Sequence, residues 1–134
     1  MTRGGTRFER LAAFRHALRK FLHFSEAASE RVGITGQQYH ALLALRAGAG
    51  KPMTVNDLAE QLVLKHNSAV GLADRLAEQR LLSRRPARDD ARKVNLELTA
   101  KGRRVIDRLV VVHSAELKRV GGHLAKVLLE ISKA

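Results

Sequence analysis

Apolar residues near the start of the chain recur every three or four positions. From Phe8 to Leu22 they form one stripe with basic residues between them, which is the pattern of an amphipathic helix. We expect Gly33 to end this helix. The segment Thr35-Gly-Gln-Gln38 has the pattern of a capping box. It predicts the start of a second helix, which ends near the Gly48-Ala-Gly50 turn.

Two further helices are expected in the centre of the chain. Thr54 can cap the first of them, and Asp57 lies in its first turn, where the helix dipole favours a carboxylate. Helical spacing of apolar residues continues to Leu62. After a short turn, the segment from Asn67 to Gln79 predicts another helix. This succession is typical of a helix-turn-helix.

The hydrophobic period then changes from that of a helix to that of a strand. A short segment, Leu81–Arg85, precedes a polar turn, and apolar residues alternate with polar ones over Val94–Leu98. The two segments predict a β-hairpin. A long last helix is expected to start at Thr99. We expect Gly121-Gly122 to break or bend it, leaving a final, separate helical piece.

These elements predict a mainly α fold with a small β-hairpin wing, that is, a winged helix-turn-helix. We expect one domain over residues 1–134, with the winged lobe at about 35–102. The flanking helices, about 1–34 and 103–134, are more apolar than a small winged core needs. They predict dimerisation, and a second copy of the same chain is the simplest partner.

Composition narrows the partner and the cellular setting. The 134 residues have a formal charge of +12, which favours a polyanion: DNA, RNA or an acidic membrane surface. A merely soluble basic protein is the plain alternative. The absence of cysteine excludes disulfides, thiolate metal sites and thiol redox sensing. The apolar runs are too short for a membrane span and no signal peptide is evident, so we expect a cytoplasmic protein that does not bind membranes.

The sequence shows no pattern of a catalytic site. There is no Ser/His/Asp order in a recognisable context, no glycine-rich phosphate loop and no metal motif. The six histidines are scattered, and exposed or helix-packing roles for them are commoner than a zinc site assembled in a dimer. We therefore expect neither enzymatic activity nor a cofactor or metal.

One face of the Asn67–Gln79 helix is suited to DNA. Its apolar residues share the opposite face, which leaves Asn67, Ser68 and Gly71 exposed near its start. The two polar side chains can bond base edges or phosphates, and Gly71 allows close approach at a helix-propensity cost of about 1 kcal/mol. This suits a recognition helix that enters a major groove. An ordinary exposed helical turn is the alternative.

The hairpin turn and the residues before the recognition helix are the other candidate contacts. An exposed basic turn suits the narrow minor groove, although most such turns are simply solvated. Lys65 and His66 are candidate phosphate contacts, and His66 is also suited to capping or packing. The full set of DNA-binding candidates is Lys65, His66, Asn67, Ser68, Gly71, Arg75, Arg84, Arg88, Arg92 and Lys93.

Several of these segments together resemble the MarR family of bacterial transcriptional regulators. The most distinctive is the wing, Asp89-Asp-Ala-Arg92 followed by Val94-Asn-Leu-Glu-Leu-Thr99-Ala-Lys-Gly102. The recognition-helix segment Asp74-Arg-Leu76 is the next. Leu58-Ala-Glu-Gln-Leu62 and Leu81-Leu-Ser-Arg-Arg85 also fit, and the resemblance extends over essentially the whole chain.

The resemblance implies a DNA-binding regulator, a repressor by expectation, in which the N- and C-terminal helices of two subunits interlock. The homodimer would bind a pseudo-palindromic operator in double-stranded DNA, with the recognition helix in the major groove and Arg92 in the minor groove. Asp74 would pair with Arg92. A small aromatic or phenolic effector would bind between the dimer helices and the lobe and release the DNA.

Candidates for that ligand pocket are also ordinary core positions: Phe14, Leu18, Tyr39, His40 and Leu43. The chain departs from the family pattern at Arg80, where glycine is usual. The short C-terminus with its Gly121-Gly122 pair predicts a less extensive dimer region, and the lack of cysteine excludes the peroxide-sensing branch. A ligand-independent winged-helix module that binds nucleic acid, including RNA, or another protein remains the alternative.

Overall fold

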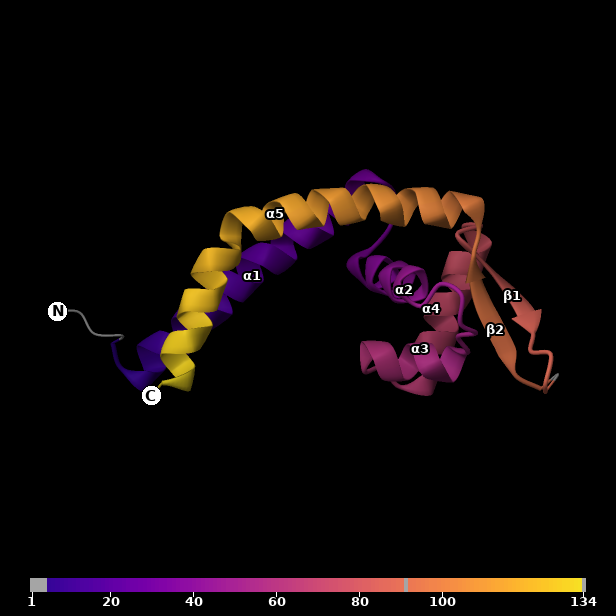
Figure 1. The fold of residues 1–134 in the computed structure, drawn as a ribbon, viewed down its shortest axis with the longest axis horizontal. Coiled ribbons are helices and arrows are strands. Elements are labelled where there is room, and N and C mark those ends of the chain that lie inside the picture. The colour runs from indigo at the N-terminus through magenta and orange to yellow at the C-terminus, as the bar shows by residue number, and fades with distance from the viewer. Residues whose placement is uncertain (1–4, 91, 134) are drawn as a thin grey trace.

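The computed structural model describes residues 5–90 and 92–133, which form an arched molecule with a helical stalk and a winged lobe (Figure 1). The elements in order are α1 (Arg7–Arg31), α2 (Gly36–Ala47), α3 (Val55–Leu62), α4 (His66–Glu78), β1 (Leu82–Pro86), β2 (Val94–Leu98) and α5 (Ala100–Ser132). The mainly α fold with a β-hairpin wing is therefore confirmed.

Threonines begin four of the five helices. Thr35 and Thr54 each accept a bond from the backbone N–H three residues later, and the side chain at that position bonds back. Thr6 forms a third such capping box at the start of α1, and Thr99 caps α5 by accepting from the Gly102 N–H. Each cap gives a hydrogen-bond partner to backbone N–H groups that would otherwise lack one. Such a cap typically stabilises the folded protein by about 1 kcal/mol.

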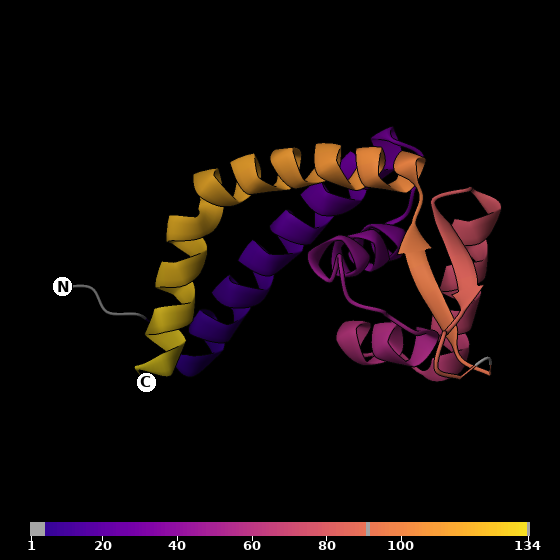
Figure 2. The same cartoon turned by 45° about the vertical axis from the view of Figure 1, so that its right-hand side comes forward.

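The expected break at Gly121-Gly122 is wrong, because α5 runs without interruption from Ala100 to Ser132. The alternative of a bend is seen: both views show α5 turning as its colour approaches yellow, while it lies beside α1 (Figures 1 and 2). A helical glycine costs about 1 kcal/mol relative to alanine, and packing of apolar residues against α1 outweighs that cost here.

Arg80 occupies the backbone position for which glycine was expected. Its φ is +63°, in the left-handed region, and the Leu81 N–H donates to the Leu76 carbonyl at 2.9 Å. The Arg80 N–H donates to the Ala77 carbonyl at 3.0 Å. Together these bonds form a Schellman motif that ends α4, at a steric cost of about 1–2 kcal/mol for a residue with a Cβ.

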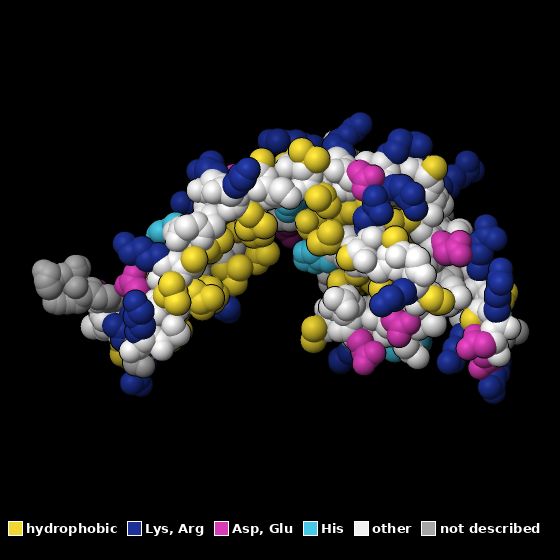
Figure 3. Space-filling view, in the orientation of Figure 1, with side chains coloured by type: hydrophobic (Ala, Val, Ile, Leu, Met, Phe, Trp, Pro, Cys, Tyr) yellow, Lys and Arg dark blue, Asp and Glu magenta, His cyan; other side chains and the backbone are white. Residues whose placement is uncertain are grey.

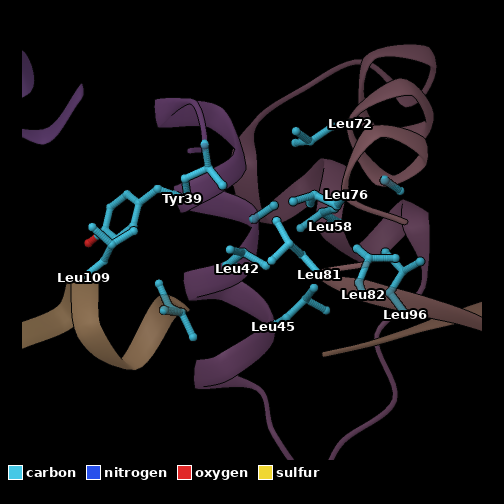
Figure 4. Close-up of a cluster of buried hydrophobic side chains, with 14 of the residues drawn as sticks. Tyr39, Leu42, Leu45, Leu58, Leu72, Leu76, Leu81, Leu82, Leu96 and Leu109 are labelled. Carbon is cyan, nitrogen blue, oxygen red and sulfur yellow. The ribbon is translucent and has the colours of Figure 1, made fainter. Parts of the chain in front are cut away.

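The core of the lobe lies between α2, α3, α4 and the hairpin. Figure 4 shows Leu58 and Leu76 close together beside Leu42, with Leu82 and Leu96 at the hairpin side. All five side chains are at most 4% exposed. Burial of each contributes about 1.5–3 kcal/mol, so this cluster fixes how α4 and the hairpin sit together.

The wing is anchored to the rest of the lobe at its base. β1 and β2 pair antiparallel with Leu82 opposite Leu98 and Pro86 opposite Val94. The Leu96 N–H donates to the Met53 carbonyl at 2.8 Å, beside an isolated bridge between Thr54 and Asn95. These bonds hold β2 against the segment before α3, and the turn of the hairpin projects away from the core.

Candidate nucleic-acid interface

Helix α4 presents the predicted polar face to solvent. The inward residues Ala69, Leu72, Ala73 and Leu76 are at most 2% exposed, as the spacing predicted. Lys65, His66, Asn67 and Ser68 are all exposed around the start of the helix, and Gly71 is half-buried. The start of α4 is thus the exposed part of the helix-turn-helix.

The first turn of α4 has no side-chain cap. Lys65 stands at the cap position and its side chain makes no capping bond, so the first backbone N–H groups of α4 keep their capacity to donate. Asn67, Ser68, Gly71 and Arg75 line a shallow hollow beside them. A Cβ added at Gly71 would meet only the end of the Arg75 side chain, at 3.4 Å. The surface is open to close approach by a ligand.

His66 links the two helices of the motif. Its Nδ1 lies 2.7 Å from the Asn56 side-chain oxygen, and because an amide oxygen only accepts, the histidine N–H donates. Asn56 belongs to α3, so this bond fixes the start of α4 relative to α3. His66 therefore acts as a packing residue in the motif, with its ring still exposed.

The expected pairing of Asp74 with Arg92 is wrong. Asp74 forms its ion pair with Arg84, which extends from β1 back to α4. Arg92 is held by Asp90, two residues earlier, through its side chain at 3.1 and 3.2 Å and its backbone N–H at 3.0 Å. These bonds, those of the Arg92 side chain foremost, lower the pKa of Asp90. Asp90 is close to Arg92 in sequence, so the turn itself brings the two side chains together. Arg92 therefore pairs with Asp90 and not with Asp74, which lies on another element.

Helix α4 and the wing nevertheless face one cavity. It is lined by Asp74, Arg84, Arg92 and Lys93, together with His66 from the start of α4. Arg92 is the most exposed of the paired arginines, with 90% of its side chain accessible. The predicted wing arginine thus projects into solvent at the mouth of a basic hollow shared with α4.

The remaining wing candidates lie around the turn. The Ala87 N–H donates to the Lys93 carbonyl at 2.9 Å and closes it, leaving Arg88 and Lys93 exposed. Arg85 pairs with Glu97 across the hairpin at 3.3 Å. Arg88, Arg92 and Lys93 lie between the two strands and are therefore the cations nearest the tip.

Aromatic side chains of α1 and α2 surround a buried histidine of α5. The sequence pattern did not reveal this cluster. His113 is 4% exposed and stacks on Tyr39, with ring centroids 4.1 Å apart and planes 9° apart. Phe21 and Phe24 approach its ring edge-on at 6.2 and 6.0 Å. Helical spacing places Phe21, Phe24 and Ser25 on one face of α1. This shared face was the one signal in the sequence from which the cluster could have been predicted.

Both nitrogens of His113 have partners. Nδ1 lies 2.8 Å from the Leu109 carbonyl, which can only accept, so Nδ1 carries a hydrogen. In the neutral ring Nε2 then accepts from the Ser25 hydroxyl, 2.7 Å away. The histidine is thus a satisfied polar group at the point where the stalk meets the lobe.

The five candidate pocket residues are not gathered around any of the four cavities described for residues 5–90 and 92–133. Tyr39 is buried against His113, and Leu43 is 36% exposed. Phe14, Leu18 and His40 are half-buried. Burial, followed by repulsion from His113, lowers the pKa of His40. The ligand pocket therefore stays a prediction.

Two further properties concern the described part of the chain. None of its helices is both long enough and apolar enough to cross a membrane. Within the same residues, no three His, Asp or Glu side chains are grouped as a metal site requires.

A helix-turn-helix followed directly by a β-hairpin defines a winged-helix protein. Residues 32–93 match the model of the MarR family. This match confirms the resemblance to the MarR family over the winged lobe.

Solved structures share the fold of nearly the whole chain. MepR, a transcription regulator of the Staphylococcus aureus multidrug efflux pump MepA, is 22% identical with a TM-score of 0.75, over 90% of this chain and 87% of that one. MepR in complex with DNA is 23% identical with a TM-score of 0.74, over 82% and 79%. YusO from Bacillus subtilis is 20% identical with a TM-score of 0.70, over 92% of both chains. No curated protein matches the chain in sequence.

Proposed function

We propose that the chain is a DNA-binding transcription regulator that inserts α4 into a major groove and the wing into the adjacent minor groove. The observation that supports this most is the cavity shared by α4 and the wing, which brings Arg84, Arg92 and Lys93 beside the exposed start of α4. One duplex lying across this surface would contact both elements.

The start of α4 has the chemistry for contact with bases and phosphates. Asn67 and Ser68 are exposed and can donate to or accept from base edges. The uncapped N–H groups favour a nearby phosphate, because they point along the helix dipole toward the ligand. Gly71 leaves room for the backbone to approach the groove.

The wing has the charge for a minor-groove contact. Arg92 is exposed and locally restrained by Asp90, so little side-chain entropy is lost when it enters the groove. Arg88 and Lys93 lie beside it at the turn and suit the flanking phosphates. MepR, a relative in fold, has been solved bound to an oligodeoxyribonucleotide, which favours DNA as the ligand class.

We further propose that the active form is a homodimer built on α1 and α5. Figure 3 shows apolar side chains on the concave side of the arch, between the stalk and the lobe. Large apolar side chains at least one-third exposed on the two helices are Phe8, Leu11, Leu22, Val111, Val112, Leu117, Leu128 and Leu129. So many exposed apolar side chains on two adjacent helices mark an interface, and a second copy covers them with closed symmetry.

The regulatory consequence follows from symmetry. Two α4 helices related by a twofold axis would bind a pseudo-palindromic operator, and a dimer bound over a promoter would repress by occlusion. An aromatic or phenolic effector between stalk and lobe, near Tyr39 and His40, would change the separation of the two α4 helices and release the DNA. This function places the chain in the cytoplasm.

Selection of preferred sites from random duplex DNA tests the proposal, followed by gel-shift competition with structured RNA. We expect one pseudo-palindromic site, and structured RNA that competes far more weakly than the selected duplex. Equal competition by both nucleic acids would instead support the alternative of a general nucleic-acid module. Screening aromatic acids and phenols for release of the selected duplex then tests the effector.

A further inference from the structure

A second basic surface lies on the far side of the lobe from the start of α4. It is formed by the end of α4 and the first turns of α5. We call it the back patch. Its exposed cations are Arg80, Lys101, Arg104 and Arg108. Figure 3 shows Lys and Arg side chains along the convex side of the arch above the lobe, opposite the apolar concave side.

Contacts between α4 and α5 hold the back patch together. The Thr99 hydroxyl donates to the Arg80 carbonyl at 2.6 Å, and Lys101 Nζ donates to the Gln79 carbonyl at 3.1 Å. Arg104 and Arg108 follow on α5, one helical turn apart. The patch is therefore one surface with a fixed arrangement of charges, although its members come from two helices.

The charges of the back patch are largely uncompensated among the described residues. The acid nearest in sequence, Asp107, is paired with Arg46 at 2.9 Å. None of the four patch cations takes part in an ion pair within residues 5–90 and 92–133. Like charges at i, i+3 and i, i+4, such as Lys101 with Arg104 and Arg104 with Arg108, destabilise a helix by a few tenths of a kcal/mol each. A bound polyanion would remove that repulsion.

The geometry separates the back patch from the proposed operator surface. Helix α4 has 13 residues, so its two ends lie about 20 Å apart along its axis. The operator would contact the start of α4, whereas the back patch lies at its end. A straight duplex in the first position cannot reach the second, so an occupant of the back patch is a separate molecule or a distant segment.

We propose that the back patch binds the phosphate backbone of a second DNA duplex, so that the protein bridges two DNA segments. Three of its four cations are arginines, whose planar forks suit phosphate oxygens in bidentate geometry. The inference rests on the proposed function in one respect: operator binding keeps other duplex DNA at high local concentration. The contact is independent of sequence, because it involves phosphates only.

The test uses the full chain immobilised through a C-terminal tag and saturated with the selected duplex. A fluorescent duplex of unrelated sequence is then added at low salt, and both bound duplexes are quantified. The test variant is Arg80→Gln/Arg104→Gln/Arg108→Gln. The matched control is Arg15→Gln/Arg19→Gln/Lys20→Gln, which removes the same charge from exposed positions of α1.

We expect the wild type and the control to retain both duplexes. The back-patch variant should keep the selected duplex, whereas the amount of second duplex bound should fall at least about tenfold. The slope of its log affinity against log salt concentration should become shallower by roughly 2–3, because about 0.9 counterions are released per phosphate contacted. Retention of the second duplex by the variant, equal loss in the control, or equal displacement by poly-glutamate would overturn the inference. Failure to hold the selected duplex contradicts the proposed function instead, while the second duplex is still measured on both variants.

Discussion

Asp74 of the recognition helix α4 forms an ion pair with Arg84 of strand β1. The pair joins the helix that we place in the major groove to the base of the wing. It lies half-exposed at the wall of the shared cavity, with both side chains 47% accessible. The wing tip is organised separately, by Asp90 and Arg92. The two ion pairs therefore divide the interface into a helix–strand junction and an independently restrained tip.

This division predicts which residues are energetically coupled. In double-mutant cycles measured by urea unfolding, Asp74→Ala and Arg84→Ala should show a coupling of about 0.2–1 kcal/mol, the range of exposed ion pairs. Asp74→Ala and Arg92→Ala should add without measurable coupling. A larger coupling of Asp74 to Arg92 than to Arg84 would restore the pairing that the family pattern implies.

The wing tip should matter for DNA and not for folding. We expect Arg92→Ala to weaken binding of the selected duplex by about 1–3 kcal/mol in a fluorescence titration. Its unfolding free energy should change by less than about 0.5 kcal/mol, because the side chain is 90% exposed. Lys20→Ala removes the same charge from the exposed face of α1 and is the control. Unchanged affinity of the Arg92 variant would rule out the minor-groove assignment.

Two glycines of α5 should respond to alanine in opposite directions. A Cβ at Gly102 would lie 2.0 Å from the Leu81 carbonyl oxygen, so Gly102→Ala must displace backbone and should cost about 1–3 kcal/mol or more. At Gly122 nothing lies within 4 Å, and Gly122→Ala should stabilise the helix by about 0.5–1 kcal/mol. Thermal and urea unfolding of both variants check this. Destabilisation by Gly122→Ala would show that the dimer requires a glycine there.

The exposed apolar residues of α5 should control the oligomeric state. Leu117→Glu/Leu128→Glu replaces side chains that are 44% and 52% exposed, and it should convert a dimer into a monomer in sedimentation-velocity runs. Lys20→Glu changes the net charge by the same two units at an exposed polar position of α1 and should leave the dimer intact. A monomeric wild type, or a double variant that stays dimeric, would contradict the proposed interface. Circular dichroism should confirm that the variants keep their helices.

Local signals in the sequence were sufficient for the first four helices and the hairpin. The boxes at Thr35 and Thr54 and the buried face of α4 depend on residues within one or two turns, so their pattern could be interpreted without the fold. Gly121-Gly122 led to the wrong prediction of a helix end. The low helix propensity of glycine costs little free energy, and the contact between α5 and α1 that outweighs it is not visible in the local pattern.

The long-range contacts could not be obtained in the same way. The partner of Asp74 depends on how β1 packs against α4, and a pattern along either element does not encode that distance. His113 lies 88 positions after Ser25, and its burial depends on three helices meeting. The DNA candidates stay a prediction; their exposure at the start of α4 could be predicted because it is a local property of the helical pattern.

Footprinting on a selected duplex tests the central claim most directly, since it examines sequence-specific binding, the use of α4 and the wing, and twofold symmetry together. With hydroxyl radicals, the wild type should protect two half-sites whose centres lie about one helical turn, 34–36 Å, apart. Arg92→Ala should lose protection of the flanking minor grooves while major-groove contacts persist. A single protected half-site, or no preferred sequence after selection, would contradict the account.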